Sequence, residues 1–265
     1  MPDPKVEGAS AIIRDSEGVA HILGLSGGDD STLLAFLMKE REPRPYNYLC
    51  TPTGNELPAM FEHWAWLGSD NALGRRLIPI IAGTLKSVIR QQKMLPNFRA
   101  RFCTRILKIE PYERFLMEEV RNGPIVSYVG LRADEEAREG GIYSHIDGVR
   151  QRFPLREWGY DDPMVLAELA ERGIVIPPRT DCALCYHQRI GEWYTLWLEH
   201  RALFEEGIEL EDEQRATFRT PGRDSWPSGL REMAAEFEGG RIPTISLNRM
   251  KRERMSAGGC RVCSL

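Results

Sequence analysis

The chain has 265 residues and a formal net charge of −4, with 42% hydrophobic and 28% charged residues. This composition is typical of a soluble globular protein and carries no overall basic signal for nucleic acid. No apolar run approaches the roughly 20 residues that a membrane-spanning helix needs, and residues 1–10 lack the apolar core of a signal peptide. We therefore expect a cytoplasmic protein with free thiols and no membrane partner.

Strands and helices alternate along the first half of the chain. Apolar and β-branched runs predict the strands, and apolar residues at helical spacing predict the helices. The expected series is a strand over 19–25, a helix over 30–42, a strand over 46–52, a helix over 56–68, a strand over 76–82, a helix over 108–123 and a strand that begins at 125. This alternation predicts an α/β fold: an open, mostly parallel sheet with helices on both faces.

The pattern changes after about residue 155. A short helix over 162–173 is followed by a Pro-Pro turn, a C-x-x-C pair and an aromatic-rich helix over 187–200, and the remainder is polar with Pro and Gly punctuation. We therefore expect an α/β core over residues 1–160 and a helical, cysteine-bearing region over 161–265.

A Gly-Gly turn joins the first strand to the first helix. Glycine lets backbone N–H groups approach an anion, and the N-terminus of the following helix adds unpaired donors and partial positive charge. The stretch S-G-G-D-D-S (26–31) can therefore cradle a phosphate, although it lacks the spacing and the lysine of a Walker A loop. The alternative is an ordinary strand–helix turn that Asp30 or Ser31 caps.

The S-G-G-x-D-S stretch resembles the PP-loop of the adenine nucleotide α-hydrolase-like group, which includes ATP pyrophosphatases and the phosphoadenosine-phosphosulfate (PAPS) reductase family. The resemblance implies that the loop binds the phosphates of an adenine nucleotide, and that one carboxylate acts through Mg²⁺ and takes part in catalysis. The residues carried over are Ser26, Gly27, Gly28, Asp30 and Ser31, with Asp30 as the catalytic carboxylate.

Further segments, in the same order, are similar to the PAPS reductase family. They are Thr53-Gly54 with Glu56 and Pro58, the Cys-x₄-Lys-x₂-Pro element at Cys103, Lys108 and Pro111, the Gly-x-Arg-x-x-Glu-x-x-Arg segment at Gly130, Arg132, Glu135 and Arg138, and Pro154-Leu155 with Trp158. The usual aspartate before the Thr-Gly pair is replaced by Pro52. The resemblance implies nucleotide binding by Thr53, Gly54, Lys108 and Arg132, with Arg132 also catalytic.

Arg132 follows an expected strand, where open α/β sheets form their ligand crevices, and its guanidinium could pair with phosphate or sulfate. The alternative is a surface salt bridge with Glu135 or Glu136. Residues 97–108 (NFRARFCTRILK) are basic, which indicates either a solvated face or a local groove for nucleic acid.

Six cysteines include two C-x-x-C pairs, a pattern that in a cytosolic chain indicates a metal or redox site. A zinc site built from both pairs would need to span the 74-residue gap between Cys185 and Cys260, which argues against a simple zinc ribbon. In cluster-bearing relatives, cysteines at the Cys-x₄-Lys-x₂-Pro element and at a later C-x-x-C hold a [4Fe–4S] cluster. The resemblance therefore implies Cys103, Cys182 and Cys185 as ligands, with the fourth position taken by Cys263 or Cys260, or left open for a hydrosulfide.

The chain ends in GGCRVCSL. Reductases of the family carry a mobile C-terminal cysteine that attacks the sulfur of the substrate, although their usual tail is different. By that resemblance Cys260 is a candidate nucleophile, and the adjacent Arg261 would lower its thiol pKa. The alternative is a frayed terminus.

Three functional hypotheses follow from the resemblance. The first is an ATP pyrophosphatase-type sulfurtransferase that adenylates an acceptor, such as DNA or RNA, and inserts sulfur with the help of the cluster. The second is a thiol-dependent reductase of adenylyl sulfate or PAPS that releases sulfite. The third is a non-catalytic nucleotide-binding partner of a cysteine desulfurase. The intact loop and the number of thiols favour the first.

Overall fold

The structure is a computed structural model, and it describes residues 12–135 and 143–243. Within these residues five strands form one sheet, and every neighbouring pair is parallel. The spatial order is β3-β2-β1-β4-β5. The strands are β1 (Ala20–Gly24), β2 (Tyr46–Cys50), β3 (Ile78–Pro79), β4 (Ile125–Tyr128) and β5 (Val149–Arg152).

The central strand β1 is where the direction of winding reverses. The chain first moves outward from β1 through β2 to β3, and then crosses back to place β4 on the other side of β1. Ligand crevices of open α/β sheets form at such a point, beyond the carboxyl ends of the strands. The loop after β1 and the loop after β4 therefore lie next to each other, although about 100 residues separate them in sequence.

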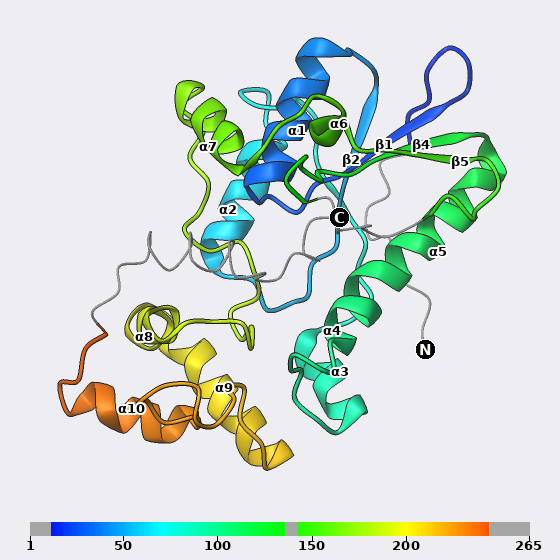
Figure 1. Cartoon of the computed structure of the whole chain (residues 1–265). Coiled ribbons are helices and arrows are strands. Elements are labelled where there is room, and N and C mark those ends of the chain that lie inside the picture. The colour runs from blue at the N-terminus through cyan, green and yellow to red at the C-terminus, as the bar shows by residue number, and fades with distance from the viewer. Residues whose placement is uncertain (1–11, 136–142, 244–265) are drawn as a thin grey trace.

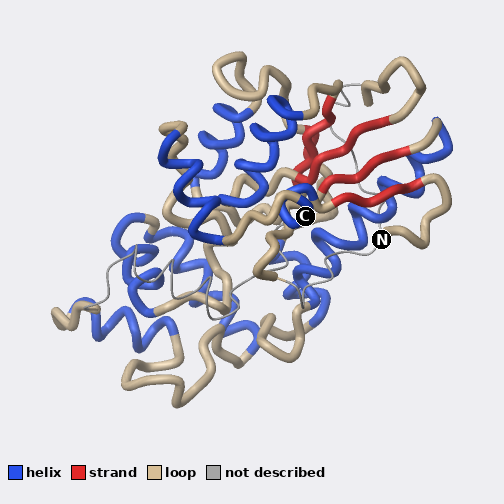
Figure 2. The backbone as a smooth tube through the Cα atoms, turned by 45° about the horizontal axis from the view of Figure 1, so that its top comes forward, coloured by secondary structure: helices blue, strands red, loops and turns tan. Residues whose placement is uncertain are grey.

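Helices cover both faces of the sheet, as Figures 1 and 2 show. On one face, α1 (Asp29–Arg41) packs with α6 (Pro154–Glu157) and α7 (Asp162–Glu171), and a core that includes Leu34 and Val165 joins them to the strands. On the other face, α5 (Glu110–Glu119) buries Tyr112 and Leu116 against Ile22 of β1. The α/β fold with a parallel sheet, expected from the sequence, is confirmed.

A third core lies away from the sheet. It joins side chains from 57–107 to side chains from 183–237, with Trp193 and Phe204 fully buried in it. Figure 1 shows its helices as a separate layer below the sheet. The helices that contribute to this core are α3 (Leu85–Gln92), α4 (Phe102–Thr104), the π-helical turn Arg105–Ile109, α8 (Ile190–Glu199), α9 (Arg201–Gln214) and α10 (Leu230–Glu238). The remaining helices are α2 (Pro58–Leu67), beside the sheet, and the 3₁₀ turn Val120–Asn122.

Two strands differ from what the sequence predicts. The expected strand over 76–82 contains only two strand residues, Ile78 and Pro79, because proline has no N–H to donate to a sheet. The edge strand β5 was not predicted, since its sequence, VRQR, lacks an apolar run. Residues 200–243, which matched no motif, form α9 and α10.

None of the helices within 12–135 and 143–243 combines the length and the apolar character that crossing a bilayer requires.

Candidate nucleotide and thiol site

The Gly-Gly loop closes on itself through its two serines. The Ser26 and Ser31 hydroxyls lie 3.0 Å apart, and the Ser31 hydroxyl also lies 3.3 Å from the Gly28 carbonyl, to which it donates. The indole N–H of Trp64, on α2, donates to the Ser26 carbonyl at 2.9 Å. The loop is therefore held in shape by its own hydroxyls and by the helix that follows β2.

The two glycines of the loop have different reasons to be glycine. Gly27 has a φ of +86°, and a Cβ there would lie 2.8 Å from Trp64 Nε1 and 2.9 Å from Met60 Cε. Gly28 has ordinary backbone angles, and its nearest neighbours would be Ser26 Oγ and Thr180 Oγ1, both at 3.6 Å. Gly27 is thus required by the fold, whereas a methyl group at Gly28 would fit at ordinary contact distance, so the fold alone does not require glycine there. Its place beside the N-terminus of α1 suits a phosphate cradle.

Arg132 and Asp30, both predicted site residues, are paired with each other. Nη1 of Arg132 lies 3.0 Å from Oδ1 and 2.9 Å from Oδ2 of Asp30. Both side chains are almost fully buried. The pair crosses the switch point of the sheet, because Asp30 lies in the first turn of the helix after β1 and Arg132 lies in the loop after β4.

Carboxylates surround this guanidinium. Nε of Arg132 donates to Asp134 at 2.9 Å, Asp162 lies 3.4 Å from Nη1, and Glu135 lies 4.0 Å from Nη2. Burial raises the pKa of Asp30 to about 7, against the opposing charge of Arg132. Burial also raises the pKa of Asp162. The contact with Glu135 that the sequence offered as an alternative is therefore present, but it is one of several in a buried acidic cluster.

Gly130 allows this loop to approach α1. A Cβ at Gly130 would lie 3.2 Å from the backbone N of Ser31 and 3.3 Å from the carbonyl carbon and oxygen of Asp30. A larger residue would push the loop after β4 away from the phosphate loop, and with it Arg132.

The Thr-Gly segment after β2 binds the first C-x-x-C pair. The backbone N–H and the hydroxyl of Thr53 both donate to Oε1 of Glu56 at 2.6 Å, and the Thr53 hydroxyl lies 3.1 Å from Sγ of Cys182. Asn55 accepts hydrogen bonds from the backbone of Ala183 and Leu184, at 2.6 Å through its carbonyl and at 2.9 Å through its side chain. The loop after β2 and the cysteine segment are therefore one structural unit.

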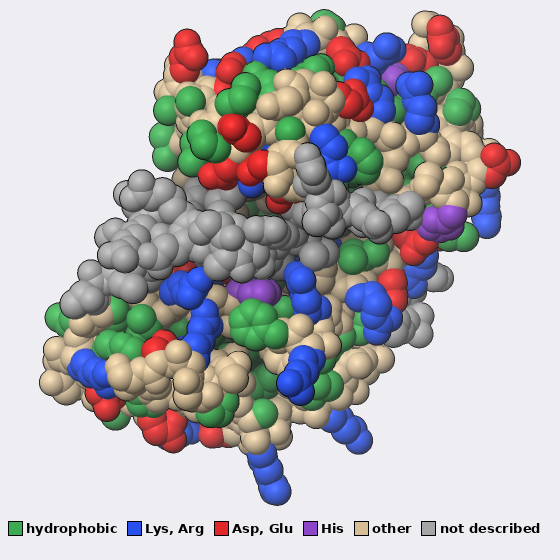
Figure 3. Space-filling view, in the orientation of Figure 1, with side chains coloured by type: hydrophobic (Ala, Val, Ile, Leu, Met, Phe, Trp, Pro, Cys, Tyr) green, Lys and Arg blue, Asp and Glu red, His purple; other side chains and the backbone are tan. Residues whose placement is uncertain are grey.

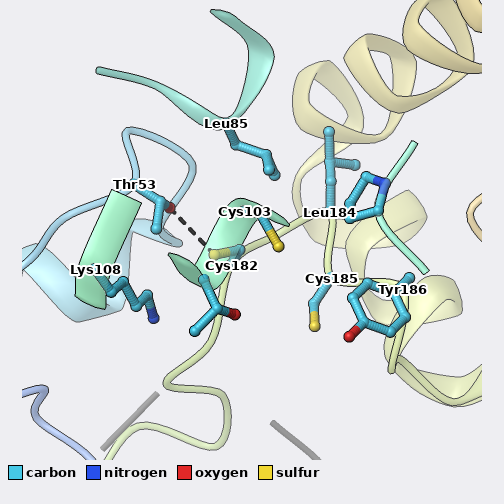
Figure 4. A pocket seen from close by; sticks show the side chains of 10 residues that line it. Thr53, Leu85, Cys103, Lys108, Cys182, Leu184, Cys185 and Tyr186 are labelled. Atoms are coloured by element: carbon cyan, nitrogen blue, oxygen red, sulfur yellow. Dashed lines mark hydrogen bonds between the residues drawn. The ribbon is translucent and has the colours of Figure 1, made fainter. Parts of the chain in front are cut away.

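Three predicted cysteines line one pocket. Cys103, Cys182 and Cys185 face it together with Lys108 and Thr53, and apolar side chains such as Leu85 and Leu184 complete its wall. Figure 4 shows that these side chains come from segments far apart in the chain: the loop after β2, α3, residues 102–109 and the C-x-x-C segment. The thiols of Cys103 and Cys182 lie near the centre of the view. The tertiary structure thus brings together thiols that lie about 80 residues apart in sequence.

Burial in this pocket favours the neutral thiols. It raises the pKa of Cys103, and it raises the pKa of Cys182 to about 11, while the charge of Lys108 acts in the opposite direction on both. Lys108, predicted as a nucleotide ligand, is itself buried in this wall. Cys50 lies on β2, outside the pocket, and burial raises its pKa to about 12.

The thiol pocket has ligand atoms of the type that an iron–sulfur cluster binds, but not a complete metal-binding geometry. Three thiols around an apolar pocket match the thiolate preference of iron–sulfur clusters. Among residues 12–135 and 143–243, however, no three His, Cys, Asp or Glu side chains are arranged to hold a metal ion. Cys260 and Cys263 lie outside the described residues, as does Arg138.

The sequence did not indicate Thr180. Its hydroxyl lies against the open side of Gly28, and two residues later the same segment contributes Cys182 to the thiol pocket. Arg179 supports this segment, since its guanidinium donates to the Cys182 carbonyl at 2.8 Å and pairs with Asp181. A hydroxyl two residues before a C-x-x-C is a weak signal, and only the fold places it at the phosphate loop.

No model of a known protein family matches the sequence, and no curated protein shows significant sequence similarity to it. Solved structures of similar fold include the following three. The PAPS reductase from Candida auris, in its phosphate complex, is 14% identical with a TM-score of 0.42, over 59% of this chain and 74% of that one. The U34-tRNA thiolase NcsA from Methanococcus maripaludis, with its [4Fe–4S] cluster, is 14% identical with a TM-score of 0.44, over 89% and 76%. The NH₃-dependent NAD synthetase from Campylobacter jejuni is 18% identical with a TM-score of 0.38, over 88% and 90%. At these scores, the functional assignment rests on the geometry of the site.

Proposed function

We propose that this protein is a PP-loop enzyme of the PAPS reductase type that uses ATP to activate an acceptor for sulfur transfer in the cytoplasm. One observation carries the proposal: residues 180–185 contact the Gly-Gly loop through Thr180 and line the thiol pocket through Cys182 and Cys185. A site that activates an oxygen and a site that handles sulfur are thereby joined through one short segment. This is the arrangement that replacement of an activated oxygen by sulfur requires.

In the proposed reaction, the acceptor oxygen attacks the α-phosphate of ATP. The bond from the α-phosphate to the bridging oxygen breaks, and pyrophosphate leaves. A reduced sulfur donor then attacks the activated carbon or phosphorus, the new bond to sulfur forms, and AMP leaves with the original oxygen. No net oxidation occurs when the donor is at the oxidation level of sulfide, and the reaction then needs only ATP and that donor. A cysteine desulfurase partner would supply sulfur as a persulfide, which two electrons from a thiol reductant must bring to the sulfide level.

In this scheme the residues of the Gly-Gly loop bind the pyrophosphate portion of ATP. Backbone N–H groups at Gly27, Gly28 and the start of α1 would donate to phosphate oxygens, with Ser26 and Ser31 adding hydroxyls. Thr53 and Gly54, after the neighbouring strand, would lie beside the nucleotide.

The acidic surroundings of Arg132 favour a magnesium-dependent reaction. Four carboxylates contact one guanidinium, at Asp30, Asp134, Glu135 and Asp162. Polyphosphate next to this cluster would be repelled unless a cation intervened. We propose that the contact between Asp30 and Arg132 is partly broken when ATP binds, and that Asp30 then contacts Mg²⁺ while Arg132 contacts phosphate.

We propose that the thiol pocket holds an iron–sulfur cluster through Cys103, Cys182 and Cys185, with Cys263 as the fourth ligand and Cys260 as a nucleophile. Such a cluster would supply iron that binds sulfur. This chain's own residues would position it beside the nucleotide, because Thr53 contacts Cys182 and Lys108 places a cation in the same wall.

The test is ATP binding by the full chain with Mg²⁺, followed by pyrophosphate release with nucleic acid and a sulfide source under anaerobic conditions. Ser26→Ala and Ser31→Ala should weaken ATP binding several-fold, because each removes a loop hydroxyl. Ser69→Ala is the control, since the Ser69 hydroxyl donates to the Trp66 carbonyl at the end of α2, outside the Gly-Gly loop. Absence of ATP binding would overturn the proposal.

Incubation with PAPS in place of ATP tests the alternative hypothesis, that the protein is a PAPS reductase. Release of sulfite from PAPS, lost in the Cys260→Ser variant, would replace the sulfurtransferase by the reductase. Nucleotide binding without release of pyrophosphate or sulfite under any of these conditions would favour a non-catalytic partner of a desulfurase.

A further inference from the structure

An exposed aromatic ring stands at the rim of the thiol pocket. Phe98 is 54% exposed, and its ring meets Tyr186 edge-on at 5.3 Å and His187 edge-on at 4.8 Å between centroids. Tyr186 and His187 are themselves buried, with their rings 4.3 Å apart. Because Tyr186 also lines the thiol pocket, the Phe98 ring lies directly beside it.

The turn that carries Phe98 is held by several hydrogen bonds. Asn97 and Ala100 exchange backbone hydrogen bonds at 3.2 and 3.1 Å, and the Asn97 side chain accepts from the backbone of Arg99 and Ala100. Phe98 and Arg99 therefore form the tip of a fixed turn. A ring presented this way loses little conformational entropy when something stacks on it.

Three arginines lie close to this ring or to its contacts along the chain. Arg99 is its neighbour in the turn, Arg189 follows His187 by two residues, and Arg223 donates to the Gln188 carbonyl at 3.2 Å. Arg99, Arg189 and Arg223 make no ion pair with the described parts of the chain, residues 12–135 and 143–243. Burial lowers the pKa of Arg223, and the charges of Arg189 and Arg219 lower it further, while Asp224 and Glu192 act in the opposite direction.

Positively charged side chains also gather on one face of the molecular surface. Figure 3 shows Lys and Arg side chains on either side of apolar and histidine side chains on the lower, helical part of the molecule. In a chain with a net charge of −4, such a concentration of positive charge is local. An exposed aromatic ring in a fixed turn, with arginines near its contacts that form no ion pair among the described residues, supplies the elements of single-stranded nucleic-acid binding.

We propose that the surface formed by Phe98, Arg99, Arg189 and Arg223 binds a single-stranded nucleic acid, with one unpaired base stacked on Phe98 and the adjacent phosphates on the arginines. This inference rests on the proposed function, and it names the class of the sulfur acceptor. The stacked base marks the position from which a neighbouring nucleotide reaches the thiol pocket. Recognition of an unpaired base excludes a regular duplex as the preferred ligand.

The test is fluorescence anisotropy with the full chain and a labelled, unstructured 12-nucleotide RNA, its DNA equivalent and the corresponding duplexes. Phe98→Ala should weaken binding of single strands by about 5-fold or more, because loss of base stacking costs about 1–3 kcal/mol. Phe98→Trp should restore it. The matched control is Phe61→Ala on α2, since Phe61 is also 54% exposed and is not among the residues that line the thiol pocket.

The arginines are tested by the dependence of binding on salt. Arg99→Ala and Arg189→Ala should each reduce the slope of log K against log salt by about 0.7, the value for one lost phosphate contact on a single strand. Arg121→Ala, an exposed arginine in the 3₁₀ turn after α5, should leave the slope unchanged. Comparison of the RNA and DNA oligonucleotides shows which of the two nucleic acids the surface binds more tightly.

Three results would overturn the proposal: equal binding by wild type and Phe98→Ala, duplexes bound as tightly as single strands, or polyglutamate displacing the oligonucleotide at equal charge concentration. These measurements need no ATP, so their failure is separate from that of the proposed function. A chain that binds ATP and releases pyrophosphate, but fails here, would transfer sulfur to another acceptor.

Discussion

Arg132 holds Asp30 across the switch point of the sheet, with one guanidinium nitrogen within 3.0 Å of both carboxylate oxygens. The two residues are 102 positions apart, and both are buried. The pair therefore joins the loop after β4 to the first turn of α1, at the place where a nucleotide phosphate is expected.

The first prediction concerns the energetic coupling of this pair. Arg132→Ala should lower the free energy of unfolding by about 3 kcal/mol or more, because it leaves buried carboxylates without their cation. Asp30→Asn should lower the free energy of unfolding by less in the Arg132→Ala variant than in wild type. The difference, which is the coupling energy of the pair, should be about 1–3 kcal/mol. Urea unfolding of wild type, the two single variants and the double variant measures this coupling energy. Additivity within about 0.5 kcal/mol would show that the pair contributes nothing as a pair.

The second prediction separates the two loop glycines. Gly27→Ala combines a positive φ with contacts of 2.8 and 2.9 Å to Trp64 and Met60, whereas Gly74→Ala has a φ of +73° and open space. Gly27→Ala should therefore be destabilised by about 1–3 kcal/mol more than Gly74→Ala. Gly28→Ala should fold with wild-type stability but bind ATP more weakly, because its methyl group occupies the cradle. Thermal unfolding and calorimetric ATP titration check both, and a Gly28→Ala variant that binds ATP normally would place the phosphates elsewhere.

The third prediction concerns the thiol pocket. Protein purified without oxygen should contain about four iron and four sulfide per chain. Cys182→Ala and Cys103→Ala should lose most of this iron, and Cys50→Ala should retain it, since Cys50 lies on β2 outside the pocket. Iron and sulfide analysis with visible absorption spectra decides the question. A colourless protein with stoichiometric zinc would contradict the cluster.

The fourth prediction concerns Glu211, whose carboxylate joins two parts of the helical layer. Its oxygens accept the backbone N–H groups of Phe218 at 2.8 Å and of Leu230, at the start of α10, at 2.7 Å. Burial raises its pKa to about 7, and the charges of Glu232 and Asp212 add to the rise. Below the ordinary pKa of a glutamate this protonated side chain contributes its full stability, and that contribution is lost as the pH rises through 7.

The measurement is the free energy of unfolding of wild type and Glu211→Gln between pH 4.5 and 8. The stability of wild type relative to the variant should fall by up to about 3 kcal/mol over this interval, because each unit of pKa shift corresponds to about 1.4 kcal/mol. Comparison with the variant cancels other titrating groups, Asp30 included. A difference that stays constant with pH would mean that Glu211 titrates normally.

The sequence predicted the order and type of the main elements because the signals are local. A buried apolar run becomes β1, and the helical spacing after it becomes α1, within one residue at each end. The short β3 and the polar β5 were harder to predict because they are edge strands. Their stability comes from pairing with β2 and β4, and the residue pattern within a strand does not indicate such pairing.

The candidate site also has one part that could be predicted from local sequence and another that could not. The Gly-Gly loop could be predicted as a phosphate cradle from a strand, two glycines and a helix start. The partner of Arg132 could not, because pairing with Asp30 depends on β4 lying next to β1. Likewise, the C-x-x-C pair predicted a thiol site, but its attachment to Thr53 and Asn55 depends on contacts over about 130 residues.

By itself, then, the sequence determined the elements, the parallel α/β class and the residue types available for phosphate and sulfur chemistry. Only the tertiary structure decided that Thr180 faces the phosphate loop while Cys182 faces the thiol pocket, and that Phe98 stands at that pocket's rim. The physical reason is that short-range patterns record backbone preference and burial. The meeting of distant side chains is set instead by strand order and by the packing of the third core, in which residues from both halves of the chain are buried together.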